Sequence, residues 1–271
     1  EDAWELGLTC GGEVDVLLER VDLDRDDEPV LQVYDMVRAE VEHGGRHAVI
    51  VRPIDGGVER LVILSDGSMK GTLGTDALDR EARTQALALM QRGRSRTLTL
   101  TDGEISRDVF FEVHGPPTTL VVFGAGTVAV PLVRLAKELG FRTVVVDGRP
   151  RFASRDRFPD ADEIIVGIPS EVAASLRCTP STFVVLVAHD YKYDVPVLRA
   201  ILRSDAGYVG MLGSKRRGRA ILDLLAAEGE RPEMLQRVHV PIGLDIGAQT
   251  AAEIALSILA EAVAVTAGRP G

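Results

Sequence analysis

The sequence predicts an α/β protein with two parts, a smaller mixed α/β domain at 1–115 and an open, doubly wound parallel sheet at 118–271. Three observations lead to this prediction. Apolar strands alternate with helical segments throughout the second part, as in βαβ units. The strand at 120–123 is apolar without interruption, which is typical of a parallel strand covered on both faces. A length of 271 residues suits two domains of ordinary size.

The first part mixes helices with short strands. Pro29 can open a helix, and the apolar residues after it recur at helical spacing until Gly44. Asp76 is expected to cap a second helix that ends at Arg92, before Gly93. Strands are expected at 14–18, 48–51, 61–64, 98–100 and 109–113, with glycine-containing turns at 55–57 and 102–103.

Two adjacent prolines, Pro116 and Pro117, interrupt this pattern. Proline cannot donate a backbone hydrogen bond, so the pair ends one strand and cannot sit inside a central one. We therefore expect the domain boundary between 115 and 118.

The second part repeats strand and helix. Strands are expected at 120–123, 143–146, 164–166, 183–188 and 208–211, and helices at 127–139, 195–203 and 216–228. A last helix is expected after Thr250, because Thr250 and Glu253 have the spacing of a capping box.

Composition and charge exclude several classes of protein. The chain is 45% hydrophobic and 27% charged, which does not suit a disordered chain, and no apolar run has the roughly 18 residues of a membrane helix. The formal net charge of −10 argues against a nucleic-acid binder, although the acidic excess is confined to residues 1–40. Two cysteines, Cys10 and Cys178, form no disulfide framework, so a cytoplasmic location is expected.

The sharpest motif is Gly124-Ala125-Gly126-Thr127-Val128-Ala129. It follows a strand, opens a helix, and precedes Asp147, which ends the next strand 23 residues after Gly124. This is the Rossmann-like dinucleotide-binding pattern. Glycines allow a tight turn and a close approach of phosphate to the helix N-terminus, and a carboxylate at Asp147 could accept ribose hydroxyls. Arg149 could meet an extra phosphate or lie solvated, and the whole motif could be a tight turn without a ligand.

Two further strand ends carry polar residues. His189, Asp190 and Lys192 follow the strand at 183–188, and Asp194 is expected to cap the next helix. Ligands bind outside the carboxyl ends of the strands in such sheets, which makes the first three residues site candidates. The strand at 208–211 leads into a predicted anion site formed by Gly213, Ser214, Lys215 and Arg216. The alternative is that both loops are simply solvated.

Cys10 is followed by Gly11 and Gly12, which leave the thiol uncrowded. A thiolate is a soft ligand suited to molybdenum or copper. A buried structural cysteine is the alternative for Cys10, and it is the expectation for Cys178.

Taken together, these stretches resemble the xanthine dehydrogenase accessory protein family, also named for its carbon monoxide dehydrogenase relatives. The resemblance runs from Thr9 to Glu261, through TCGGEVDVLLE, the stretch 121–162 that contains the glycine motif, AHDYKYDVPVLRAIL, YVGMLGSKRRG and PIGLDIGAQTAAEIALSILAE. Thr127 and Tyr191 stand where relatives commonly carry histidine. Relatives also carry an upstream segment with a second Gly-Gly-Cys motif, so we expect such a segment before Glu1.

The resemblance implies a maturation factor without turnover of its own. Such a factor binds molybdenum cofactor, as molybdopterin or its dinucleotide form, supports its sulfuration with a cysteine desulfurase, and delivers it to a molybdenum hydroxylase apoenzyme. It also implies a homodimer, with Cys10 as the suspected ligand to the metal and the Rossmann-like domain as the holder of the pterin. Neither nucleic acid nor membrane is expected as a partner.

Two other functions compete with this interpretation. One is an NAD(P)-dependent oxidoreductase, with Gly124, Gly126 and Asp147 holding the cofactor and His189 or Lys192 transferring a proton. The other is a nucleotide-sensing regulatory module. The first part of the chain has no evident acid–base set, which favours the maturation factor over a dehydrogenase.

Overall fold

The computed structural model describes residues 29–43, 45–93, 95–103, 105–188 and 191–267. By its internal contacts the chain divides into two compact units, Glu1–Pro116 and Pro117–Gly271. The strand predicted at 14–18 lies outside the described residues. None of the helices in the described part of the chain has the length and apolar character needed to cross a bilayer.

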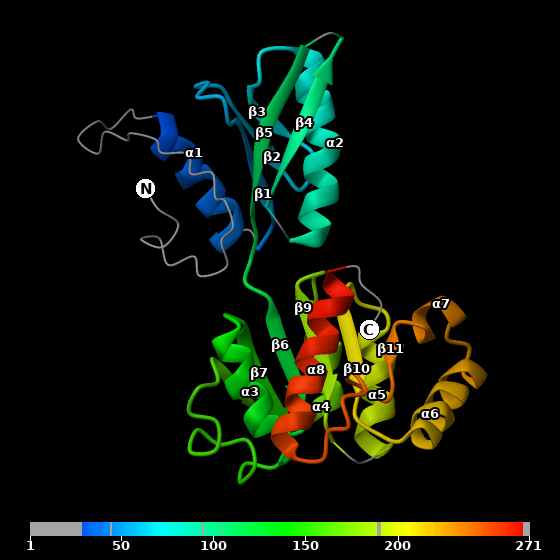
Figure 1. Ribbon diagram of the computed structural model, residues 1–271. Coiled ribbons are helices and arrows are strands. Elements are labelled where there is room, and N and C mark those ends of the chain that lie inside the picture. The colour runs from blue at the N-terminus through cyan, green and yellow to red at the C-terminus, as the bar shows by residue number, and fades with distance from the viewer. Residues whose placement is uncertain (1–28, 44, 94, 104, 189–190, 268–271) are drawn as a thin grey trace. The chain divides into compact units, whose positions relative to one another are not determined.

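The first unit contains an antiparallel sheet with the strand order β3-β2-β1-β5-β4 (Figure 1). Alternate residues of β1 point to opposite faces. Val49 and Val51 pack with helix α2, whereas Ala48 and Ile50 pack with helix α1. The elements are α1 (Pro29–Arg38), a π-helical turn η1 (Ala39–His43), β1 (Ala48–Pro53), β2 (Arg60–Leu64), β3 (Met69–Thr72), α2 (Asp76–Arg92), β4 (Arg96–Asp102) and β5 (Ile105–His114).

The structure of this unit differs from the prediction in two places. The cap of α2 is Thr75, whose side chain accepts a hydrogen bond from the Leu78 N–H at 3.3 Å, and Asp76 is the first helical residue instead. Threonine and aspartate are both good caps, so the sequence did not separate the two positions. Strand β3 was not predicted, because all four of its residues are exposed at the sheet edge and carry no apolar alternation.

The second unit contains the predicted parallel sheet, with the strand order β11-β10-β9-β6-β7-β8. Helices α3 and α8 pack on one face of this sheet, and α4, α5 and α6 pack on the other (Figure 1). The strands are β6 (Thr119–Phe123), β7 (Arg142–Asp147), β8 (Glu163–Val166), β9 (Thr182–Leu186), β10 (Tyr208–Met211) and β11 (Val238–His239). The helices are α3 (Ala129–Glu138), α4 (Pro169–Ser175), α5 (Tyr191–Ile201), α6 (Lys215–Ala227), α7 (Pro232–Leu235) and α8 (Ala251–Thr266).

The predicted fold class is therefore confirmed, and so is the capping box of α8 at Thr250 and Glu253. Helix α5 begins at Tyr191, four residues before its predicted start, so Asp194 lies in the first turn and is not the cap. The helix was expected to start after Asp194 because aspartate is a common helix cap, and Pro196 lies inside the helix instead of at its start. The short elements α4, α7 and β11 were not predicted.

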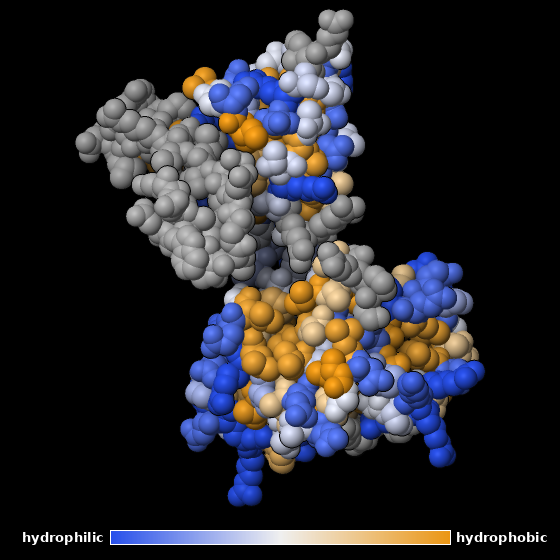
Figure 2. Space-filling model, in the orientation of Figure 1, coloured by the Kyte–Doolittle hydropathy of each residue, from blue (hydrophilic) through white to orange (hydrophobic). Residues whose placement is uncertain are grey.

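The strand order places β6 beside β9, although the chain visits β7 and β8 between them. This is the topological switch point of a doubly wound sheet, where ligands bind outside the carboxyl ends of the strands. On the face of this unit seen in Figure 2, apolar side chains also gather over α8, where Leu256 and Val263 remain exposed.

Candidate functional site

The glycine loop connects β6 to α3, and its two glycines have different roles. Gly124 has a φ of 105°, and a Cβ there would lie 2.7 Å from the backbone nitrogen of Ala188. Glycine is therefore required for the fold at this position. A Cβ on Gly126 would meet only the Val187 carbonyl oxygen, at 3.8 Å. The fold would therefore tolerate a side chain at 126, and the glycine leaves open space beside the loop.

Asp147, at the end of β7, holds this loop in place. Its Oδ2 accepts a hydrogen bond from the Ala125 N–H at 2.8 Å. The Ala125 carbonyl oxygen in turn accepts a bond from Nη1 of Arg157, at 2.6 Å. Both backbone groups of Ala125 are thus fixed by side chains, one from the last residue of β7 and one from the segment that follows it.

Arg149 forms a close pair with Asp147. Its Nε and Nη2 donate to the two oxygens of the Asp147 carboxylate at 2.9 and 2.8 Å. Burial alone would raise the pKa of Asp147, but the hydrogen bonds from Arg149 and Ala125 outweigh burial and hold that pKa below its ordinary value. The carboxylate is therefore ionised at neutral pH and is 5% exposed.

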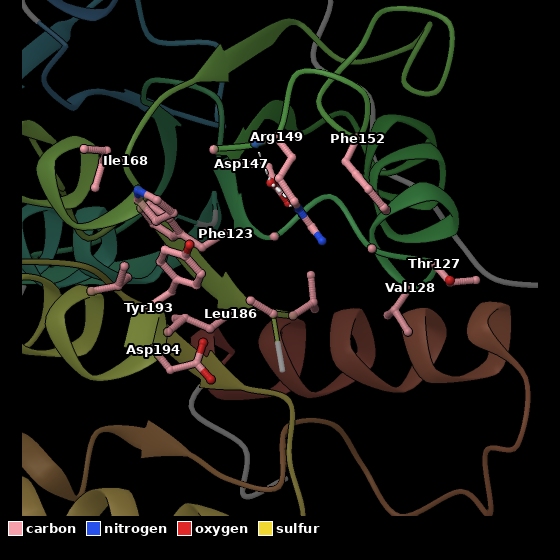
Figure 3. Close-up of a pocket in the computed structure, with 17 residues that line it drawn as sticks. Phe123, Thr127, Val128, Asp147, Arg149, Phe152, Ile168, Leu186, Tyr193 and Asp194 are labelled. Atoms are coloured by element: carbon pink, nitrogen blue, oxygen red, sulfur yellow. Dashed lines mark hydrogen bonds and ion pairs between the residues drawn. The ribbon is translucent and has the colours of Figure 1, made fainter. Parts of the chain in front are cut away.

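These groups border a cavity of about 730 Å³ at the switch point (Figure 3). That volume is within the usual range for sites that bind small molecules and cofactors. The cavity is lined by five of the residues predicted from the sequence, namely Gly124, Gly126, Thr127, Asp147 and Arg149. Helix α3 begins at this cavity, its N-cap Val128 makes no side-chain capping bond, and its first turn carries no acidic residue. The loop, the helix start and the Arg149 side chain together suit an anionic ligand.

The structure places the other predicted residues elsewhere. Gly213, Ser214, Lys215 and Arg216 lie at the start of α6, where the two cations are exposed and do not line the cavity. Lys192 is exposed too, 5.8 Å from the centre of the Tyr193 ring. Cys10, Gly11, Gly12, His189 and Asp190 fall outside the described residues.

The cation at the start of α6 that turns inward is Arg217. Its Nη2 pairs with the carboxylate of Asp194, which is 1% exposed and lines the cavity. The inward orientation of Arg217 depends on the rotation of α6 about its axis, which three consecutive cations do not reveal in a sequence.

Several lining residues had not been identified as candidates from the sequence. Phe152 lies beside Arg149, with its ring centre 3.9 Å from the guanidinium carbon. Tyr193 points into the cavity from α5, and Ile168 and Pro169 contribute from the start of α4 (Figure 3). An aromatic residue in a loop has no periodic pattern, so the only available signal for Phe152 was its proximity to Asp147 in sequence.

No group of three or more His, Cys, Asp or Glu side chains suited to a metal ion occurs among the described residues. Cys178 is half-buried and packs against the core on the α4, α5 and α6 side of the sheet. Burial raises the pKa of its thiol. A protonated, packed thiol fits the structural role expected for Cys178.

Comparison with known proteins decides the family. The XdhC Rossmann domain family matches residues 120–262, more than half of the chain. The chain belongs to the XdhC family. The matched segment runs from β6 into α8, and so includes the glycine loop and every wall of the cavity described above.

Relatives of this XdhC protein extend the similarity beyond that segment. It is 28% identical over 261 residues to a probable xanthine dehydrogenase subunit of Bacillus subtilis (strain 168), across 96% of this chain and 72% of that protein. It is 26% identical over 270 residues to the molybdenum cofactor insertion chaperone PaoD of Escherichia coli (strain K12), across 82% of this chain and 84% of PaoD.

A solved structure is also similar to this chain. The crystal structure of a xanthine dehydrogenase from Bacillus halodurans superposes with a TM-score of 0.66 at 28% identity, covering 90% of this chain and 68% of that one. The resemblance to the accessory protein family is thereby confirmed.

Proposed function

We propose that this XdhC protein holds molybdenum cofactor in the cavity at the β6–β9 switch point and delivers it to a molybdenum hydroxylase apoenzyme. Family membership supports an accessory role in the maturation of such enzymes, and the name of PaoD supports molybdenum cofactor as the cargo. The observation that carries the proposal is the cavity of about 730 Å³ beside the glycine loop. The Gly126 side of that loop is open, as the approach of a phosphate requires.

The residues present fit such a cargo. The pterin cofactor ends in a phosphate or a dinucleotide tail, which suits the glycine loop and Arg149. Phe152 and Tyr193 supply aromatic surface for a ring system. The cargo brings its own molybdenum chemistry, while the chain binds, orients and shields it.

The finer parts of the role belong to this proposal as well. We assign sulfuration of the cofactor to a cysteine desulfurase acting on the loaded protein, and we assign contact with the metal to Cys10, whose thiolate would be a soft ligand. The enzyme served is of the xanthine or carbon monoxide dehydrogenase type, and the chain acts as a homodimer.

The test is to produce the full chain in a host that makes molybdenum cofactor. Pterin and molybdenum per chain are measured, followed by activation of a cofactor-free hydroxylase. Gly126→Val should lower pterin retention at least tenfold without loss of stability, because its side chain fills the cavity and not the core. Gly213→Val is the matched control, since Gly213 does not line the cavity, and it should retain the pterin.

Two cysteine variants complete the experiment. Cys10→Ser should lose molybdenum and the ability to activate the hydroxylase, whereas Cys178→Ala should lose neither. Absence of pterin from the wild-type chain would contradict the proposal, and equal retention in the two cysteine variants would remove Cys10 from it. Turnover of a metabolite with NAD or NADP at about one per second would favour an oxidoreductase instead.

A further inference from the structure

The Asp147 carboxylate lines the cavity but has no free acceptor position. In dinucleotide-binding sheets the carboxylate at this point accepts hydroxyl groups from a ribose. Here Oδ2 accepts from Ala125 N and Arg149 Nη2, both at 2.8 Å, and Oδ1 accepts from the backbone N and the Nε of Arg149, both at 2.9 Å. A carboxylate offers about four such positions. A ribose diol could bind Asp147 only by displacing these donors.

The Arg149 guanidinium is the group that faces the ligand space instead. Two of its five side-chain N–H groups go to Asp147, and the other three have no partner among the described residues. Its side chain is 59% exposed and projects into the cavity (Figure 3). The pair with Asp147 and the ring of Phe152 fix the plane of the guanidinium. Arg157 also lies against this ring, with its guanidinium carbon 5.1 Å from the ring centre, but it donates to the Ala125 and Phe152 carbonyl oxygens and is not among the residues that line the cavity.

From this arrangement we infer that the Arg149 end of the cavity binds a phosphomonoester and disfavours a ribose diol. A fixed, planar guanidinium with free N–H groups matches the oxygens of a phosphate, which it can bind in a bidentate manner. This inference rests on the proposed function, since it specifies the chemistry of the ligand in the same cavity.

The same phosphomonoester could come from two sources. One is the terminal phosphate of a pterin side chain, and the other is the 2′-phosphate of an adenosine nucleotide. Both place a dianionic phosphate beside a ring system. Each source is therefore tested with its own pair of probes, and the two members of a pair differ by one phosphate.

The experiment is calorimetric titration of the purified full chain at low salt. The first pair is adenosine 2′-monophosphate and adenosine, which keeps the ribose diol and carries no phosphate. The second pair is a stable oxidised derivative of the cofactor's pterin, with and without its terminal phosphate. The phosphorylated member of at least one pair should bind at least tenfold more tightly than its partner. The pair that shows this difference identifies the source.

Two variants assign the difference to a single side chain. Arg149→Met keeps an unbranched side chain over Phe152 but removes the charge, and it should reduce the ratio of dissociation constants to about one. It also frees acceptor positions on Asp147, so adenosine should bind more tightly to this variant than to the wild type. Arg151→Met removes a neighbouring, exposed positive charge and should keep the tenfold ratio.

Three results would overturn the inference. These are equal affinity for both members of each pair, a tenfold ratio that survives in Arg149→Met, and no binding of any probe at millimolar concentration. The proposed function fails on a different result, the absence of pterin from the chain produced in a competent host. If the chain retains pterin but binds both members of each pair equally, the proposed function stands and the inference about the phosphate is wrong.

Discussion

The two sheets of this chain place their charged groups in different locations. In the antiparallel sheet of the first unit, Glu112 lies on a sheet face, 2.7 Å from Arg52 and within hydrogen-bond distance of the Tyr34 hydroxyl on α1. In the parallel sheet of the second unit, Asp147 and Arg149 lie at the end of a strand and border the cavity. Both groups are paired within the chain, and the second of them borders the cavity.

Strand direction explains the difference. An antiparallel sheet sends the ends of neighbouring strands to opposite edges, and one of its faces can carry polar groups. A parallel sheet with helices on both faces buries its strands, so polar groups collect where the strands end. The cavity of the proposed function therefore lies in the second unit, and each unit can be tested separately.

The largest expected effects come from core leucines, one in each sheet. Leu61 in β2 and Leu120 in β6 are both fully buried. Replacing either with alanine should lower the free energy of unfolding by about 2–5 kcal/mol, because the substitution leaves a cavity. Hydrogen exchange resolved by peptide should show faster opening in residues 29–116 for Leu61→Ala and in 117–267 for Leu120→Ala. Equal acceleration in both units would show that they unfold as one.

An intermediate effect is expected from the paired carboxylates. Glu112→Gln and Asp147→Asn should each cost about 1–3 kcal/mol, since each leaves partly buried donors with a weaker acceptor. Only Asp147→Asn should also weaken ligand binding, because Asp147 holds the glycine loop and Glu112 does not. Urea unfolding and titration with the same ligand would measure the two quantities. Loss of binding in Glu112→Gln would contradict the separation of the two units.

The same carboxylates predict a pH dependence. His114 and Arg52 lower the pKa of Glu112 despite its partial burial, and the pKa of Asp147 is also below its ordinary value. A lowered pKa in the folded chain means that the stabilisation is complete above the ordinary carboxyl pKa and is lost as the pH falls through the lowered value. Each variant should therefore reduce the acid sensitivity of its own unit. Urea unfolding between pH 5 and about pH 2 would measure this change.

The smallest effect is expected from the double variant Lys215→Ala with Arg216→Ala. Both side chains are exposed, so the free energy of unfolding should change by less than about 0.5 kcal/mol. Because neither lines the cavity, ligand affinity should fall less than threefold, far less than in Arg149→Met. A larger loss, with a flatter salt dependence, would bring the start of α6 back into the site.

Some features of the fold and the site were predictable from the sequence and others were not, depending on which structural constraint each residue pattern reflects. The apolar strand at β6 and the glycine motif predicted the fold and the loop, because burial and tight turns restrict the residues that can occur there. The distance between Gly124 and Asp147 correctly placed the carboxylate beside the loop. The saturation of that carboxylate by Arg149 was not predictable, since it depends on how the chain turns after β7. The inward orientation of Arg217 was not predictable either, because it depends on the rotation of α6 about its axis.

The fixed position of Ala125 has a consequence for the rate of binding. Its N–H and carbonyl groups are both held by side chains before any ligand arrives. The conformational entropy of this loop is therefore lost during folding and not during association. A preorganised loop of this kind lowers the entropic cost of binding and needs no rearrangement to admit the ligand. The association rate constant should thus lie in the ordinary range of about 10⁵–10⁷ M⁻¹ s⁻¹, with affinity set mainly by how slowly the ligand leaves.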